Sequence, residues 1–394
     1  MRLRQAIFWA HLSAGTVAGI VILLMSITGV LLTYERQLAD WADLRLYRPS
    51  PPYAGARRLS LEALLRGVHE RQTGVQLTTV TVRAGDAPVA VTAGARTLFV
   101  NPYSGEVLGE GAPNVRAFFR KVRDWHRWLG VAGAGRTTAR AVTGACNLAF
   151  LFLVTSGFYL WWPRKWSWRQ IRNVVWFRRG LTSHSRDFNW HNTIGFWCSV
   201  PLFVVVLSAT VISYRWSSDL VYRLAGEEPP RTVAAAVPGG SRSADVRIAG
   251  VDDLLRQAQQ QVPGWRTLSF RIPGGKDQTA SITIDEGTGG EPQKRSTLVM
   301  DLASGQLKRW EPFSAQTRGR RWRSWLRFAH TGEVAGLAGQ TIAGIASAAG
   351  AVLVWTGIGL ALRRFSRWRM ATVGDRSRPS GIDMAGETRR RRAS

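Results

Sequence analysis

Cysteine is nearly absent from this 394-residue sequence: only Cys146 and Cys198 occur, both within apolar stretches. A disulfide-stabilised scaffold is therefore not expected. The sequence has no Cys-x-x-Cys-His motif for covalent haem attachment and no cysteine–histidine cluster with zinc-site spacing. It also lacks a phosphate-binding Gly-Lys-Ser/Thr loop and a dinucleotide-binding glycine fingerprint. These absences disfavour a soluble, nucleotide-driven enzyme.

Acidic residues are also scarce, with 26 Asp and Glu against 53 Lys and Arg, for a net charge of +27. In a soluble protein this imbalance would indicate nucleic-acid binding. Here much of the positive charge flanks stretches that carry almost no charge, where arginines face lipid headgroups. A membrane span needs about 20 apolar residues. The sequence predicts four such spans, and the first is too long for a signal-peptide core.

The apolar stretches and their flanks predict how the chain is divided by a membrane. The expected spans are 1–34, 138–163, 190–214 and 333–363. Two domains of α+β type are expected on the periplasmic side, at 35–137 and 215–332. A cytoplasmic loop, 164–189, and a basic cytoplasmic tail, 364–394, hold most of the arginines of the short flanks. Arginine-rich short flanks remain in the cytoplasm, so both termini should lie inside a bacterial inner membrane.

The two expected outer domains resemble each other, which indicates an internal duplication. Each begins with a short amphipathic helix, at 60–71 or 251–261, and continues with alternating strand-like runs. Each then has a turn in which Gly105 or Gly305 can supply a positive φ. The predicted fold class is a four-span α-helical membrane bundle with two α+β domains.

Histidine is rare but regularly placed. One histidine lies near the N-terminal end of every expected span: His11, His126, His191 and His330. The other two, His69 and His184, lie in an expected outer-domain helix and in the cytoplasmic loop, and are not expected to be ligands. A single interfacial histidine is usually no more than an amphipathic side chain. Four in matching positions of a duplicated unit favour a function.

The direction of the spans restricts which histidines can act together. His11 and His191 should lie near the cytoplasmic face, and His126 and His330 near the outer face, about 30 Å away. Only histidines of the same face can share one ligand. Two imidazoles that face each other across a helix bundle suit a six-coordinate haem iron. Two such sites would form an electron path across the membrane, although glycines and arginines near the histidines also fit ordinary helix packing and lipid contact.

The sequence resembles the PepSY-associated transmembrane proteins from about Arg2 to Arg364. The marks of this resemblance are His11 with Thr28-Gly29, the turn Asn101–Val107, Trp125-His126-Arg127, Asp187–His191, and His330 with Thr356-Gly357. The third span departs from the pattern, with Ala209-Thr210-Val211 where Thr-Gly is expected. The family looks like bacterial inner-membrane ferric-siderophore reductases that hold b-type haem. The resemblance implies two haem b groups, ligated by His11, His126, His191 and His330.

Three functions remain open from the sequence. The first is a haem-dependent reductase that passes electrons from an unidentified donor to a ferric siderophore on the periplasmic side. The second is a non-redox membrane anchor whose PepSY domains bind or inhibit a periplasmic peptidase or another partner. The third is a transporter, which has little support because the notable polar residues within the spans are only Asn147 and Gln340.

Overall fold

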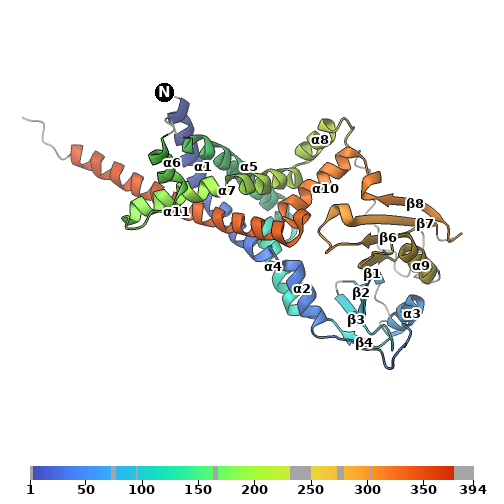
Figure 1. The fold of residues 1–394 in the computed structure, drawn as a ribbon. Helices are drawn as coiled ribbons and strands as arrows, with labels where there is room; N and C mark the ends of the chain where they lie inside the picture. Colours follow the sequence, from blue (N-terminus) through green and yellow to red (C-terminus); the bar gives the residue numbers. More distant parts are fainter. Residues whose placement is uncertain are drawn as a thin grey trace, which may run out of the picture. The chain divides into compact units, whose positions relative to one another are not determined.

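The computed structural model describes residues 3–71, 77–94, 96–162, 167–230, 250–272, 279–301 and 304–376 (Figure 1). Part of the expected loop 164–189 and the end of the expected tail 364–394 lie outside these residues. The chain forms two compact units. The first unit comprises Met1–Leu23, Ala149–Val200 and Ala349–Ser394, and the second comprises Leu24–Leu148 and Pro201–Ala348. Each unit is described by itself.

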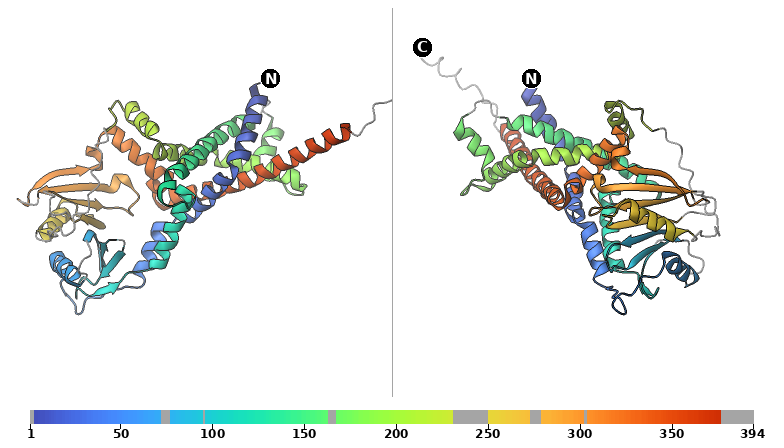
Figure 2. Two further views of the ribbon diagram at one scale, coloured as in Figure 1. Left: turned by 180° about the vertical axis from the view of Figure 1, so that it is seen from behind. Right: turned by 45° about the vertical axis from the view of Figure 1, so that its right-hand side comes forward.

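Within the described residues, four helical segments are long and apolar enough to cross a membrane, the number that the sequence predicts. The helices that carry them are α1 (Leu3–Leu32), α5 (Arg136–Trp161), α7 (Ser183–Ser213) and α11 (Gly336–Arg376) (Figure 2). Three of them extend beyond the expected limits: α5 begins before residue 138, α7 begins before residue 190, and α11 continues past residue 363. A helix can continue into polar residues because its backbone hydrogen bonds do not depend on the side chains. Hydropathy alone therefore does not locate the polar ends of these helices.

Small residues bring the helices of the first unit together. A methyl group added at Gly15 would lie 3.7 Å from the Leu153 side chain, and one at Gly19 would lie 3.2 Å from Ile358. Close approach at small residues is the usual basis of helix packing in membranes. This unit also contains the short helix α6 (Trp168–Val175), whose last carbonyl accepts a 2.9 Å hydrogen bond from the Trp197 indole.

Polar side chains connect helices in the second unit. The Gln37 amide donates to the Gln340 side-chain oxygen at 2.6 Å, and Gln340 donates to the Thr33 carbonyl at 3.0 Å. Asn147 donates to the Val206 carbonyl at 3.1 Å and to the Thr210 hydroxyl at 2.9 Å. Both polar residues singled out in the spans therefore have structural partners on other helices, as buried amides require.

Among its described residues, the second unit contains an antiparallel sheet of eight strands, in the order β4-β3-β2-β1-β5-β6-β7-β8. The strands are β1 (Leu77–Arg83), β2 (Val89–Ala93), β3 (Arg96–Val100), β4 (Val107–Gly109), β5 (Thr267–Arg271), β6 (Thr279–Asp285), β7 (Arg295–Asp301) and β8 (Leu307–Pro312). The two expected domains thus share one sheet. Their junction is the β1–β5 pair, in which Val80 lies opposite Phe270.

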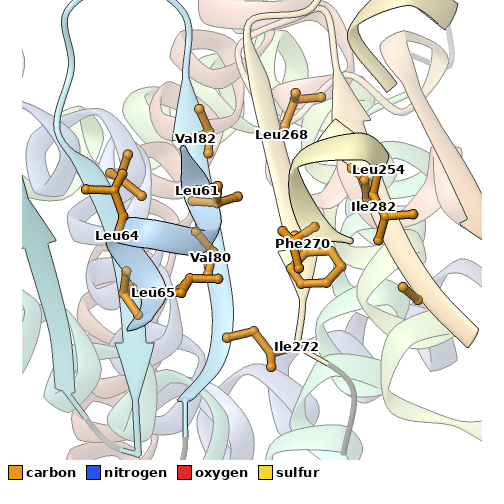
Figure 3. Packing of buried hydrophobic residues seen from close by; sticks show 14 of the residues in the cluster. Leu61, Leu64, Leu65, Val80, Val82, Leu254, Leu268, Phe270, Ile272 and Ile282 are labelled. Atoms are coloured by element: carbon orange, nitrogen blue, oxygen red, sulfur yellow. The ribbon is translucent and has the colours of Figure 1, made fainter. Parts of the chain in front are cut away.

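One face of this sheet is covered by two amphipathic helices, α3 (Leu61–Arg71) and α9 (Val251–Gln261), close to the ranges expected from the sequence (Figure 3). Apolar residues alternate along the strands, so that one side of each strand faces the helices. Val80 and Phe270 are 0% and 2% exposed, and they belong to one hydrophobic cluster that spans both halves of the sheet. The core is therefore shared across the junction.

The predicted turns are present in both halves. Gly105, between β3 and β4, has a φ of 71°, and Gly305, between β7 and β8, has a φ of 66°. The Asn101 carbonyl accepts from the Gly105 amide, and the Asp301 carbonyl accepts from the Gly305 amide, each at 3.0 Å. A side chain at either glycine would be strained in this left-handed conformation.

Two helices that the sequence analysis did not predict as helices precede spans in the second unit. They are α4 (Pro113–Trp128) and α10 (Arg318–His330). Each packs against the helix that follows an earlier span: α4 contacts α2 (Glu35–Leu44), and α10 contacts α8 (Arg215–Leu224). These arginine-rich helices carry two of the four singled-out histidines, so they position half of the candidate site.

Candidate functional site

His126 and His330 lie close together in the second unit. His126 is in the last turn of α4, and His330 is the last residue of α10. Their ring centroids are 6.3 Å apart, with 47° between the ring planes. This separation suits two imidazoles that bind one metal ion from opposite sides, because a metal–imidazole bond is about 2 Å long.

Both imidazoles of this pair are half-buried, and their surroundings disfavour the charged form. Burial lowers the pKa of His126 to about 4, and the adjacent His330 contributes to the shift. Burial also lowers the pKa of His330. A neutral imidazole is the form that binds a metal ion, since the ligand nitrogen needs a free lone pair.

His11 and His191 form the other pair, within the first unit. His11 lies on α1 and His191 on α7, and the two rings are close enough to interact electrostatically. The His11 Nδ1 lies 2.8 Å from the Ser156 hydroxyl of α5. The His191 Nδ1 lies 3.0 Å from the Thr356 hydroxyl of α11. Each ring of the pair is thus anchored on a different neighbouring span.

His126 is anchored in the same way, with its Nδ1 2.9 Å from the Thr28 hydroxyl of α1. Each of these three hydroxyls already donates its hydrogen to the carbonyl four residues earlier on its own helix: Thr28 to Leu24, Ser156 to Phe152, and Thr356 to Val352. A hydroxyl has a single hydrogen to donate, so it accepts from the imidazole. Nδ1 therefore carries the proton in all three rings, and Nε2 has the free lone pair.

His330 has a different partner but the same tautomer. Its Nδ1 lies 2.9 Å from the Val205 carbonyl on α7, and a carbonyl can only accept. The Ser208 hydroxyl lies 2.6 Å from the Val204 carbonyl, four residues earlier on its own helix, and 2.9 Å from the Val205 carbonyl. Ser208-Ala209 therefore occupies the place that Thr-Gly has on the other helices. From the sequence, this departure was expected at Ala209-Thr210-Val211, but the Thr210 hydroxyl accepts a hydrogen bond from Asn147 instead.

A glycine follows each of the three anchoring hydroxyls and leaves room for the ring. A methyl group added at Gly157 would lie 3.3 Å from the His11 Cε1, and one at Gly357 would lie 3.2 Å from the His191 Cε1. At Gly29 the corresponding distance to the His126 Cε1 is 3.7 Å. The first two distances are tighter than ordinary carbon contacts, so a side chain there would displace the imidazole.

The donor sets fit haem iron. Within the described part of the chain, no group of three or more His, Cys, Asp or Glu could hold a bare metal ion. A pair of neutral imidazoles is instead the axial set of a six-coordinate haem, whose macrocycle supplies the other iron ligands. In the first unit, the buried Trp161 Nε1 and Arg363 Nη1 have no hydrogen-bond partner. Such donors suit a polar substituent of a bound group, for example a propionate.

Arginines gather around the second pair. Burial, and then the neighbouring Arg140, Arg123 and Arg327, lower the pKa of Arg127, whereas Asp124 opposes the shift. Three further guanidinium groups thus lie within electrostatic range of Arg127 and make its surroundings electropositive. Such a cluster attracts carboxylate-rich or otherwise anionic molecules.

The structure brings the four singled-out histidines into two pairs, and iron ligation by them stays a prediction. The two excluded histidines lie elsewhere: His69 is exposed on α3, and His184 is in the first turn of α7. Ser156-Gly157 was not predicted from the sequence, because serine stands where the Thr-Gly pattern has threonine.

A comparison with protein families finds a match over most of the chain. The model described as the PepSY-associated TM region matches residues 8–364, which includes all four histidines and both halves of the sheet. No match to a curated protein was found.

Proposed function

The chain belongs to the PepSY-associated transmembrane family, and on this premise we propose that it is a haem-dependent ferric-siderophore reductase of the bacterial inner membrane. The observation that carries the proposal is the pair His126 and His330, whose ring centroids are 6.3 Å apart. Each ring has its Nδ1 hydrogen-bonded to another helix, which leaves Nε2 as the ligand nitrogen. His11 and His191 provide the second ligand pair.

In this proposal each histidine pair holds one haem b, which supplies a one-electron carrier when bound. The reaction transfers one electron from a donor on the cytoplasmic side to Fe(III) in the chelate, giving Fe(II), and no covalent bond is formed or broken. Hard oxygen ligands hold Fe(II) less strongly than Fe(III), so reduction promotes release of the iron. The chain itself supplies the axial imidazoles, the apolar surroundings that exclude water, and the arginines around Arg127 that attract an anionic chelate.

The proposal requires His11 and His191 to lie near the cytoplasm, with the sheet in the periplasm. Both halves of the sheet then correspond to PepSY-like domains that arose by duplication, since each contains a helix followed by four strands. Reporter fusions test this topology. Fusions after Trp168 and Met370 should report the cytoplasm, and fusions near Gly85 and Gly275 should report the periplasm, because the short arginine-rich flanks stay inside. A periplasmic signal after Trp168 would reverse the assignment of faces.

The absorbance spectrum of the purified protein tests the function most directly. We expect a Soret band in the oxidised protein, and sharpened α and β bands after reduction with dithionite, with two haem b per chain by pyridine haemochromogen. When an anionic ferric chelate is mixed with the reduced protein, the absorbance spectrum should return to that of the oxidised form. A reduced spectrum that persists in the presence of several ferric chelates would contradict the reductase assignment.

The same measurement decides the alternative. A protein purified from haem-replete cells that shows no Soret band would favour the second function, a membrane anchor whose sheet domain binds a periplasmic peptidase or another partner. The large buried core of the sheet is compatible with either role.

A further inference from the structure

Three of the four candidate ligands share a second feature, which lies on the spans that they contact. In each of three places, a hydroxyl contacts one imidazole and the next residue is a glycine, which has no side chain beside the ring. These places are Thr28-Gly29, Ser156-Gly157 and Thr356-Gly357. In every case the histidine is on a different helix from the hydroxyl. The arrangement therefore recurs at three independent places in the chain and is not a local consequence of one helix.

We propose that Thr28, Ser156 and Thr356 are positioning residues, which fix the orientation and the donor strength of the iron-binding imidazoles. This inference rests on the proposed haem function. The hydroxyl accepts the Nδ1 hydrogen, so the ring cannot rotate freely and its Nε2 would be free to bind a haem iron. A hydrogen bond from Nδ1–H also makes the imidazole a stronger electron donor, which stabilises the ferric state and lowers the reduction potential.

The glycines that follow the hydroxyls also help to fix the position of the imidazole rings. The added methyl groups at Gly157 and Gly357 would lie 3.3 Å and 3.2 Å from the Cε1 atoms of His11 and His191. A ring pushed away from the helix would lose the hydroxyl contact, because the two contacts involve adjacent atoms of the same imidazole. Hydroxyl and glycine therefore act together, and neither alone would hold the ring at this distance.

The fourth ligand, His330, is held differently, and this difference makes the two haems distinguishable. Ala209 follows Ser208 where the other spans have glycine, and His330 bonds the Val205 carbonyl. Both histidines of the first-unit haem would therefore be hydrogen-bonded to hydroxyls, those of Ser156 and Thr356. In the second-unit haem, one histidine would be hydrogen-bonded to the Thr28 hydroxyl and the other to a backbone carbonyl. Removal of a hydroxyl should thus affect one haem at a time.

The test uses full-length, haem-loaded protein and near-isosteric variants. Thr28→Val should raise the potential of one haem and shift its low-spin electron paramagnetic resonance signal, while the other haem keeps both properties. Thr356→Val should do the same to the other haem. We expect a change of about tenfold in the reduction equilibrium, which is 59 mV for one electron, together with faster loss of the affected haem to apomyoglobin. Thr28→Ser and Thr356→Ser should restore the wild-type values.

Matched controls separate positioning from general disturbance. Thr155→Val removes a neighbouring hydroxyl on α5 that bonds only its own helix and is exposed, so both haems should be unchanged. Gly357→Ala should alter the first-unit haem, whereas Gly195→Ala, where the added methyl lies 3.6 Å from Leu353, should not.

The outcomes distinguish this inference from the proposed function. Wild-type protein without haem would overturn both. Haem-loaded Thr28→Val and Thr356→Val proteins with wild-type potentials and resonance signals would overturn the positioning role alone. Equal shifts of both haems in a single variant would also contradict it, since each hydroxyl contacts one ligand.

Discussion

His126→Ala is expected to remove one of the two haems, and the further substitution His330→Ala is expected to remove little more. The two rings are 6.3 Å apart, so they would bind one iron, and loss of either ligand opens the same site. Residues that act as a unit give such non-additive losses. The haem-to-protein ratio, measured by pyridine haemochromogen across single and double variants, checks this expectation.

The other pair should behave in the same manner, with His11→Ala and His191→Ala affecting the remaining haem. A double variant that takes one histidine from each pair, such as His11→Ala with His330→Ala, should lose both haems. His69→Ala and His184→Ala are the matched controls and should retain full haem content. His184 is the more stringent control, because it lies on the same helix as His191.

Specific results would contradict this pairing. If His11→Ala and His126→Ala behaved as one unit, the assignment of one haem to each pair would be wrong. If His184→Ala lost a haem while His191→Ala kept both, the second ligand of His11 would be His184. Full haem content in all four single variants would remove these histidines from the site altogether.

The second large effect is expected at the junction of the sheet. Phe270→Ala should destabilise the protein by about 3–5 kcal/mol, the usual cost of truncating a buried phenylalanine. Phe270 is 2% exposed and lies opposite Val80 on the neighbouring half of the sheet. Because the core is shared, both halves should unfold in one transition at lower denaturant concentration. Denaturant unfolding in detergent, followed by the β-sheet circular dichroism signal, measures the change.

The adjacent position provides the control for this substitution. Arg271 is exposed, so Arg271→Ala should change stability by no more than about 0.5 kcal/mol. Limited proteolysis of Phe270→Ala should cut both halves of the sheet at similar rates. Selective cutting of the half that contains Phe270, while the half that contains Val80 stays protected, would show that the two halves fold independently.

The sequence determined the parts of this protein that depend on local pattern. Length and lack of charge located the spans, because a helix that crosses lipid must bury about 20 consecutive residues. The alternation of apolar residues located strands such as β1 and β6, and Gly105 and Gly305 marked their turns. The regular spacing of histidines relative to the spans identified the four candidate ligands. Each of these signals lies within a short segment of chain.

Only the tertiary structure decided how these segments combine. The β1–β5 pairing joins residues that are far apart in the sequence, and an exposed strand edge carries no sequence mark of its partner. The helices α4 and α10 were obscured by their arginines, and only their packing shows where His126 and His330 meet. The hydrogen bonds of His11 to Ser156 and of His330 to the Val205 carbonyl could likewise not be predicted from the sequence. Side-chain hydrogen bonds between helices depend on the distance and rotation of both helices, which the pattern of either helix alone does not encode.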